Sequence, residues 1–213
     1  MKNVLHVGCG YSTLKNLPNY FQDGSWEEIR LDIDENVNPD IVGTLQDMSI
    51  IEDGIMDALY SSHNVEHVWA FEVPQVVREF ARVLKPDGFV MVLCPDITSV
   101  AQAVLQGSLN KSLYESPAGP ITALDILYGF HADLERGRHY MAHKTAFTAE
   151  SLAQVFLDNG FKGVRVVRDR MFGLHGIAVK NDIAAATLDA MMPALFPPGE
   201  SLLEVVNAGC IGG

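Results

Sequence analysis

The stretch Val4-Leu5-His6-Val7-Gly8-Cys9-Gly10-Tyr11-Ser12 decides the fold of this chain. A short, mainly apolar run leads directly into two glycines that one residue separates. The run predicts a buried parallel strand, and glycines after such a strand let the backbone approach a ligand closely. We therefore expect an α/β protein whose first strand ends at a ligand loop, although a glycine turn at this place is by itself a weak signal.

Strands and helices alternate along the rest of the chain. Apolar runs bounded by polar turns predict strands over residues 28–32, 40–43, 57–62, 89–93, 161–168 and 176–179. Helical spacing and end signals predict helices over residues 73–84 and 148–160, the first ended by Lys85-Pro86-Asp87-Gly88. After Lys180 we expect one helix and a loose apolar end. This order is typical of a doubly wound α/β fold.

Residues 96–147 depart from this alternation. They are rich in Gly, Ser, Pro and His and lack long alternating apolar strands. We interpret them as an insertion at the carboxyl end of the fifth strand, within a single domain of residues 1–213. Ligands of open α/β sheets bind at that edge, so we expect the insertion to shape a pocket or a lid.

Composition and charge narrow the function class. The 213 residues are 48% hydrophobic, and 27 Asp and Glu against 15 Lys and Arg give a net charge of -12, which would repel nucleic acid. Cys9, Cys94 and Cys210 have no ligand-like spacing, so we expect neither disulfides nor zinc, and a reducing cytoplasm. No apolar stretch approaches the ~20 residues that span a bilayer, and no charged leader precedes the first strand, so we expect no membrane partner.

Several segments in the right order resemble the class I S-adenosylmethionine-dependent methyltransferases, in particular their small-molecule, methyltransferase type 11-like branch. These segments are residues 4–10, Leu31-Asp32-Ile33-Asp34, Asp47-Met48, residues 56–68 and residues 78–88. The resemblance implies a Rossmann-like fold with a mainly parallel, seven-stranded sheet whose last strand is antiparallel. It also implies S-adenosylmethionine as the cofactor.

The resemblance assigns the cofactor to residues at the strand ends: Gly8, Cys9, Gly10, Asp32, Asp47, Met48, Ser62 and His63. The glycine loop would hold the methionine end, and Asp32 would accept hydrogen bonds from the ribose hydroxyls, with Asp34 as its local competitor. Asp47 and Met48 would lie beside the adenine. Ser62 stands where relatives that methylate bases carry an Asn-Pro-Pro-aromatic motif, so a base is disfavoured as acceptor.

The glycine motif departs from the family pattern just after Gly10. Tyr11 and Ser12 follow where a further small residue is usual, and Pro18 and Asp23-Gly24 leave little room for the first helix of the fold. We expect that helix to be one or two turns long or absent.

Histidines supply the candidates for a general base: His63, His131, His139 and His143, the last three from the insertion. His63 and His67 flank Glu66 and are four residues apart, so on a helix they would share one face. The pair has no obvious third ligand, so we predict a packing cluster and no metal site.

The leading hypothesis for function is S-adenosylmethionine-dependent methyl transfer to a small, non-nucleic-acid acceptor. The alternative is a non-catalytic protein of the same fold that binds S-adenosylmethionine or S-adenosylhomocysteine. A nicotinamide-dependent enzyme is a third hypothesis, weakened because the loop lacks the last glycine of the dinucleotide fingerprint. The acceptor, the general base and the oligomeric state stay open.

Overall fold

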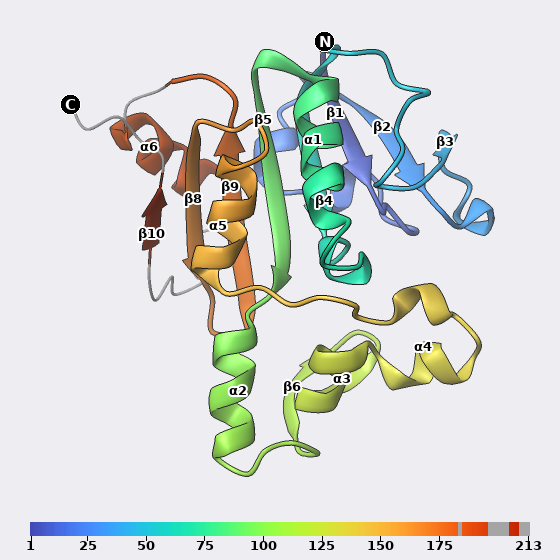
Figure 1. Ribbon diagram of the computed structural model, residues 1–213. Helices are drawn as coiled ribbons and strands as arrows, with labels where there is room; N and C mark the ends of the chain where they lie inside the picture. The colour runs from blue at the N-terminus through green and yellow to red at the C-terminus, as the bar shows by residue number, and fades with distance from the viewer. Residues whose placement is uncertain (183–184, 196–204, 209–213) are drawn as a thin grey trace.

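Strand β1 (Lys2–Val7) lies inside an eight-stranded sheet that runs through the molecule (Figure 1). The computed structural model describes residues 1–182, 185–195 and 205–208. The strand order is β10-β8-β9-β5-β4-β1-β2-β3. The other strands of this sheet are β2 (Trp26–Asp32), β3 (Ile41–Val42), β4 (Met56–Ser62), β5 (Leu84–Pro95), β8 (Gly163–Arg168), β9 (Gly173–Val179) and β10 (Val205–Ala208).

Strands β1 to β5 pair in parallel, and β9 is antiparallel to both of its neighbours, β5 and β8. This confirms the expected mainly parallel, seven-stranded sheet with its last strand antiparallel. Strand β10 adds an eighth strand, antiparallel to β8. The tail expected to end as a loose apolar segment therefore includes an edge strand, because the open edge of β8 offers it hydrogen-bonding partners.

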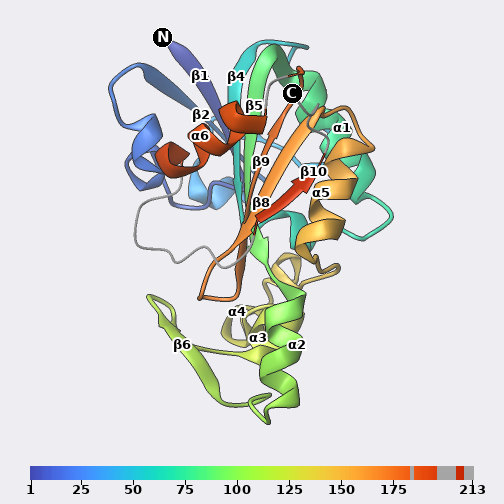
Figure 2. The ribbon, with the colours of Figure 1, turned by 90° about the vertical axis from the view of Figure 1, so that its left-hand side faces the viewer.

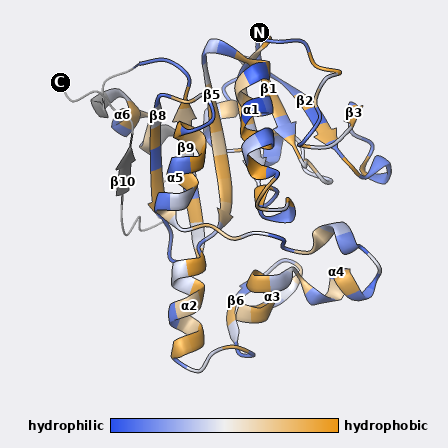
Figure 3. Cartoon of the chain, viewed as in Figure 1, coloured by the Kyte–Doolittle hydropathy of each residue, from blue (hydrophilic) through white to orange (hydrophobic). Residues whose placement is uncertain are grey.

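Helices α1 (Val73–Val83) and α5 (Ala149–Leu157) cover one face of the sheet, and α6 (Ala185–Leu195) lies on the other (Figure 2). The apolar residues of α1 and α5 pack against β5 and its neighbours, which Figure 3 shows as mainly hydrophobic. Thr148 caps α5 by accepting a hydrogen bond from the Ser151 amide. Within the described ranges, none of the helices has the length and apolar character to cross a membrane.

The opposite face lacks the long first helix of the fold, as the positions of Pro18 and Asp23-Gly24 in the sequence predicted. Residues 8–25, all described, contain the two 3-10 turns η1 (Leu14–Asn16) and η2 (Asn19–Phe21) instead of an α-helix. Phe21 is fully buried there, with its ring 5.0 Å from that of Trp26 and 6.3 Å from that of Phe89. Helix α6 packs beside this aromatic cluster, so a C-terminal helix covers part of the surface that the first helix leaves open.

Helix α1 ends at Val83, but the expected turn after it is part of strand β5. Leu84 pairs with Met56 and Phe89 pairs with Ala58, so Lys85-Pro86-Asp87-Gly88 forms a bulge in the ladder. The strand therefore starts earlier than its apolar run, because Leu84 already has a partner in β4.

Residues 96–147 leave the sheet at the carboxyl end of β5 and lie below that edge (Figure 1). They return to it at Phe147, which forms a bridge with Asp96. Asp96 also caps the first helix of the segment by accepting from the amides of Thr98 and Ser99. The elements of this segment are α2 (Ile97–Leu105), β6 (Ser112–Ser116), β7 (Gly119–Thr122), α3 (Ala123–Tyr128), α4 (His131–Glu135) and the 3-10 turn η5 (His139–Met141).

Candidate functional site

Two cavities adjoin at the carboxyl edge of the sheet. The first, of about 440 Å³, is lined by Gly8, Gly10, Asp32, residues 43–46 and Ser62, and we name it the loop cavity. The second, of about 340 Å³, is lined by Leu93, Tyr114, Ile126, Phe130 and residues 171–175, and we name it the insertion cavity. Their shared lining consists of His63, His67 and Met141.

The glycine loop is built around Asn64. Gly8 and Gly10 have φ angles of 58° and 51°, which a side chain disfavours. A Cβ atom at Gly8 would lie 1.7 Å from Oδ1 of Asn64. Asn64 Nδ2 donates to the carbonyl oxygens of Val7 and Ser62, both at 2.9 Å. Asn64 thus joins the ends of β1 and β4, and only glycine fits against it at position 8.

Arg30 holds the loop where the first helix is missing. Its guanidinium donates to the carbonyl oxygens of Gly10 at 2.6 Å, Ser12 at 3.1 Å and Asn38 at 2.8 Å. On the same strand, Glu28 accepts from the Leu14 amide at 2.6 Å. Sequence reasoning missed Asn64, Arg30 and Glu28. One feature of the sequence could have pointed to Glu28 and Arg30. They alternate along β2, and alternate residues of a strand face the same side of the sheet.

Asp32, which the sequence assigned to the ribose, lines the loop cavity and also supports the glycine loop. One carboxylate oxygen accepts from the Gly10 amide at 2.7 Å and the other from the Asp34 amide at 2.9 Å. Each oxygen can accept another hydrogen bond, so the group can still take a vicinal diol. Asp34 lines the same cavity, but Asn36 and the Tyr140 hydroxyl of the insertion bond its carboxylate.

Three of the predicted cofactor residues lie off both cavity linings. The Cys9 side chain is buried, and the Cys9 amide donates to the Leu31 carbonyl. Met48 is fully buried in the core, and the Asp47 carboxylate accepts from the Ser49 amide. Residues 43–46 line the loop cavity in their place, because the core packing of Met48 turns that part of the loop away.

His63 and Glu66 form a polar pair at the junction of the cavities. The expected helix through His63 and His67 is the 3-10 turn η4 (Val65–His67), and His63 precedes it with a φ of 54°. His63 Nδ1 lies 3.3 Å from Glu66 Oε1. Desolvation lowers the pKa of His63, but the hydrogen bond and charge of Glu66 outweigh it and raise the pKa above 6.5. Burial raises the pKa of Glu66, yet the neighbouring histidines bring it below its usual value.

The three histidines of the insertion lie in different surroundings. His143 lines the insertion cavity, and its Nδ1 lies 2.7 Å from the Ile126 carbonyl oxygen. Burial is the main cause that lowers the pKa of His143. His131 is paired with Asp125 at 2.7 Å, and His139 is exposed; both lie off the two linings. The structure thus brings His63 and His143, of the four candidates, to the insertion cavity.

Asp169 and His175 also line the insertion cavity, and sequence reasoning missed them. His175 Nε2 lies 2.6 Å from Asp169 Oδ2, and both side chains are buried. They flank the hairpin between β8 and β9, which the sequence marked only as two closing strands. No motif separates them from ordinary hairpin residues.

Comparison with known proteins identifies a domain and a shared fold. Residues 5–92 match the family model described as a methyltransferase domain. No curated protein sequence matches the chain. Similar solved structures include a protein of Pyrococcus horikoshii OT3, with 14% identity and a TM-score of 0.56, covering 85% of this chain and 83% of that chain. At such identities the similarity concerns the fold.

Two further similar structures carry a description of activity. One is a SAM dependent methyltransferase from Archaeoglobus fulgidus, with 15% identity and a TM-score of 0.56, covering 83% of this chain and 85% of that chain. The other is the 1,6-didemethyltoxoflavin-N1-methyltransferase of Burkholderia thailandensis with bound S-adenosylhomocysteine. It has 15% identity and a TM-score of 0.52, covering 84% of this chain and 71% of that chain.

Proposed function

We propose that this protein methylates a small acceptor bound in the insertion cavity, because residues 5–92 match a methyltransferase-domain model and the fold is similar to that of S-adenosylmethionine-dependent methyltransferases. The cofactor is S-adenosylmethionine, which supplies an electrophilic methyl group when bound. The loop cavity fits it: glycine backbone at one end, the Asp32 carboxylate for the ribose, and Ser62 and His63 toward the acceptor.

The shared lining of His63, His67 and Met141 carries this proposal. A donor in the loop cavity and an acceptor in the insertion cavity would meet at this place. Holding two reactants in line is the main requirement of methyl transfer, because the sulfonium is already a good leaving group. Of the four histidine candidates, His63 lies on the shared lining, which supports it as the group that takes a proton from the acceptor. This arrangement favours catalysis over a purely binding role.

The lining of the insertion cavity favours an acceptor with an apolar body that also carries polar groups. Tyr114 and Phe172 stack with their ring centres 6.3 Å apart, and Phe130 adds a third ring to the lining. Polar groups of the same lining include His63, Glu66 and the buried pair of Asp169 and His175. A volume of about 340 Å³ is typical of a small-molecule site.

The cytoplasmic location and the lack of nucleic-acid and membrane partners stay predictions.

Calorimetry with S-adenosylmethionine and S-adenosylhomocysteine tests the cofactor assignment. Wild-type protein should bind both, and Asp32→Ala should lose about 1.5–3 kcal/mol of binding free energy, since a charged acceptor is removed. Asp87→Ala is the matched control, because Asp87 is exposed in the β5 bulge. Unchanged affinity in Asp32→Ala would transfer the role to Asp34. No heat with either ligand would refute the proposal.

Catalysis is tested by chromatographic detection of S-adenosylhomocysteine formed with small hydroxyl, thiol and amine acceptors. Product formed only in the presence of an acceptor supports methyl transfer. Tight binding of both cofactor forms without turnover on any acceptor class would favour the non-catalytic alternative.

We also propose that residues 96–147 act as an insertion within one domain and cover both cavities. The Tyr140 hydroxyl donates to Asp34 at 3.1 Å across the loop cavity, which supports this role. Tyr140→Phe should speed the dissociation of S-adenosylhomocysteine about 2–10-fold, the effect of one lost hydrogen bond. Tyr128→Phe is the control, since Tyr128 is 61% exposed and lies off both linings. Equal dissociation rates in the two variants would contradict the covering role.

A further inference from the structure

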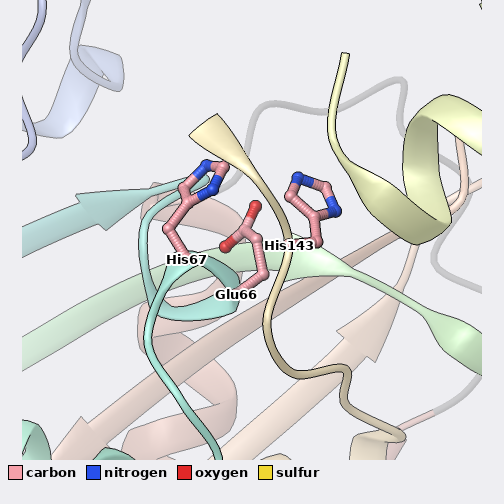
Figure 4. Close-up of side chains that lie close together, drawn as sticks. All are labelled: Glu66, His67 and His143. Atoms are coloured by element: carbon pink, nitrogen blue, oxygen red, sulfur yellow. The ribbon is translucent and has the colours of Figure 1, made fainter. Parts of the chain in front are cut away.

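Glu66, His67 and His143 gather at the wall of the insertion cavity (Figure 4). One ligand atom from each side chain lies within 4.8 Å of the other two. Glu66 and His67 come from η4, whereas His143 comes from the returning end of the insertion. The sequence had offered no third ligand beside the histidines that flank Glu66, and the fold supplies one in His143.

Both histidines have a ring nitrogen close to a backbone carbonyl oxygen, as metal-bound histidines usually do. His143 Nδ1 lies 2.7 Å from the Ile126 carbonyl oxygen, and His67 Nδ1 lies 3.2 Å from the Ala142 carbonyl oxygen. A carbonyl oxygen only accepts, so each Nδ1 carries the proton and donates it. The lone pair of each ring is then on Nε2. A backbone carbonyl that fixes the tautomer in this way is the usual outer partner of a metal-bound histidine.

The surroundings of one carboxylate oxygen of Glu66 favour a bound cation. Its side chain is 1% exposed, and Oε1 lies 3.3 Å from His63 Nδ1. Oε2 is buried and has no hydrogen-bond partner in the part of the chain that the structure describes. Burying a carboxylate oxygen without a partner is costly, and a bound cation would compensate for that cost.

Backbone hydrogen bonds hold the three ligands together. The amides of Lys144 and Thr145 donate to the Glu66 carbonyl oxygen at 2.7 and 3.2 Å. The His143 amide donates to the Tyr128 carbonyl oxygen at 3.1 Å. The bonds to Glu66 fix the segment that carries His143 against η4, so the cluster does not depend on exposed side chains.

We propose that Glu66, His67 and His143 bind a divalent transition metal of the zinc class. Two imidazoles and one carboxylate form a ligand set that binds zinc and leaves a coordination position open. Ligand atoms at ~2.0–2.2 Å from a zinc ion lie about 3.4 Å apart, so each atom needs to move by at most about 1 Å from its present place.

The open position would face the insertion cavity, which the three ligands line. A metal there would bind an oxygen, nitrogen or sulfur atom of the acceptor and place it near the shared lining. Binding of the acceptor by the metal rests on the proposed function, whereas binding of the metal by the protein does not. A metal there would narrow the acceptor to molecules that carry a metal-binding donor atom.

The proposal is tested by titrating the EDTA-treated full chain with Co²⁺. This ion occupies zinc sites and absorbs visible light when protein ligands bind it. We expect one Co²⁺ to bind per chain and to give a visible d–d absorption band. Adding Zn²⁺ should displace the Co²⁺ and abolish the band, whereas adding Mg²⁺ should not. His143→Ala, His67→Ala and Glu66→Gln should each weaken Co²⁺ binding at least 100-fold. His139→Ala is the matched control, because His139 is exposed in the same insertion and should leave the titration unchanged.

Calorimetry with S-adenosylhomocysteine on the metal-free protein keeps the two proposals distinguishable. Retained binding in His143→Ala shows that this variant is folded, and Glu66→Gln, which keeps the shape of the side chain, provides a second test. Absence of the d–d band in folded wild-type protein would overturn the metal site, as would a band that survives in His143→Ala or Glu66→Gln. Metal binding without cofactor binding would leave the metal site standing and remove the proposed function.

Discussion

Replacing Gly8 by alanine tests how the glycine loop is built. Gly8 has a φ of 58°, and alanine in that region costs about 1–2 kcal/mol. The new Cβ would also lie 1.7 Å from Asn64 Oδ1 and displace that side chain. Asn64 would then lose its hydrogen bonds to the carbonyls of Val7 and Ser62, each contributing about 0.5–1.5 kcal/mol. We expect a total loss of about 2–5 kcal/mol in the free energy of unfolding.

Gly10→Ala is the matched control for this substitution. Gly10 has a similar φ of 51°, but apart from its two chain neighbours no described residue has an atom within 4 Å of its Cβ position. It should therefore cost only the backbone term, about 1–2 kcal/mol. Urea unfolding of the cofactor-free protein measures both values without interference from a ligand.

A double-mutant cycle with Asn64→Ala separates the clash from the backbone strain. Removing the Asn64 amide clears the space that the new Cβ needs, so Gly8→Ala should cost less in that background, by about 1–3 kcal/mol. Additive effects of the two substitutions would refute the role assigned to Asn64. Equal losses in Gly8→Ala and Gly10→Ala would refute it as well.

Two further predictions concern charged side chains. Arg30→Met should lower the free energy of unfolding by about 2–4 kcal/mol and weaken S-adenosylhomocysteine binding about 10-fold, because carbonyls of the glycine loop lose their donor. Arg82→Met, which frees the carbonyls of Met48 and Ile51 away from both cavities, should destabilise similarly and leave affinity within about twofold; parallel losses of affinity would count against a specific role of Arg30. Burial raises the pKa of Asp125, but hydrogen bonds from Thr122 and His131 lower it overall from 3.8 to about 2. The charged form therefore stabilises the fold above pH 3.8, and that contribution is lost as the pH falls toward about 2. Asp125→Asn should cost about 2 kcal/mol near neutral pH and flatten the acid dependence of urea unfolding in that window; an unchanged acid profile would contradict the lowered pKa of Asp125 and the hydrogen bonds assigned to it.

Local patterns were sufficient to predict most of the sheet. The apolar run at 57–62 became β4 (Met56–Ser62), and the helical spacing at 73–84 became α1 (Val73–Val83). Such elements follow from the alternation and spacing of neighbouring residues. The β5 bulge and β10 were not predicted, because both depend on a partner strand distant in sequence.

The candidate site divides in the same way. Gly8, Gly10 and Asp32 could be selected from the sequence, because glycines and an acidic residue at strand ends are typical of a cofactor-binding loop. Asn64 and Arg30 were missed, since an asparagine after a strand and an arginine within one carry no such signal. Met48 was misplaced because the sequence identifies a loop without revealing which of its residues turn toward the core.

The sequence by itself determined a parallel sheet with a ligand loop at its carboxyl edge, because strand patterns and glycine turns are local properties of the chain. Only the tertiary structure decided which side chains meet at that edge. Lys144 and Thr145 bind the Glu66 carbonyl through the backbone, and this contact brings His143 to Glu66 and His67. Hydrogen bonds between distant backbone groups leave no pattern in the sequence, so the cluster could be found only once the chain was folded.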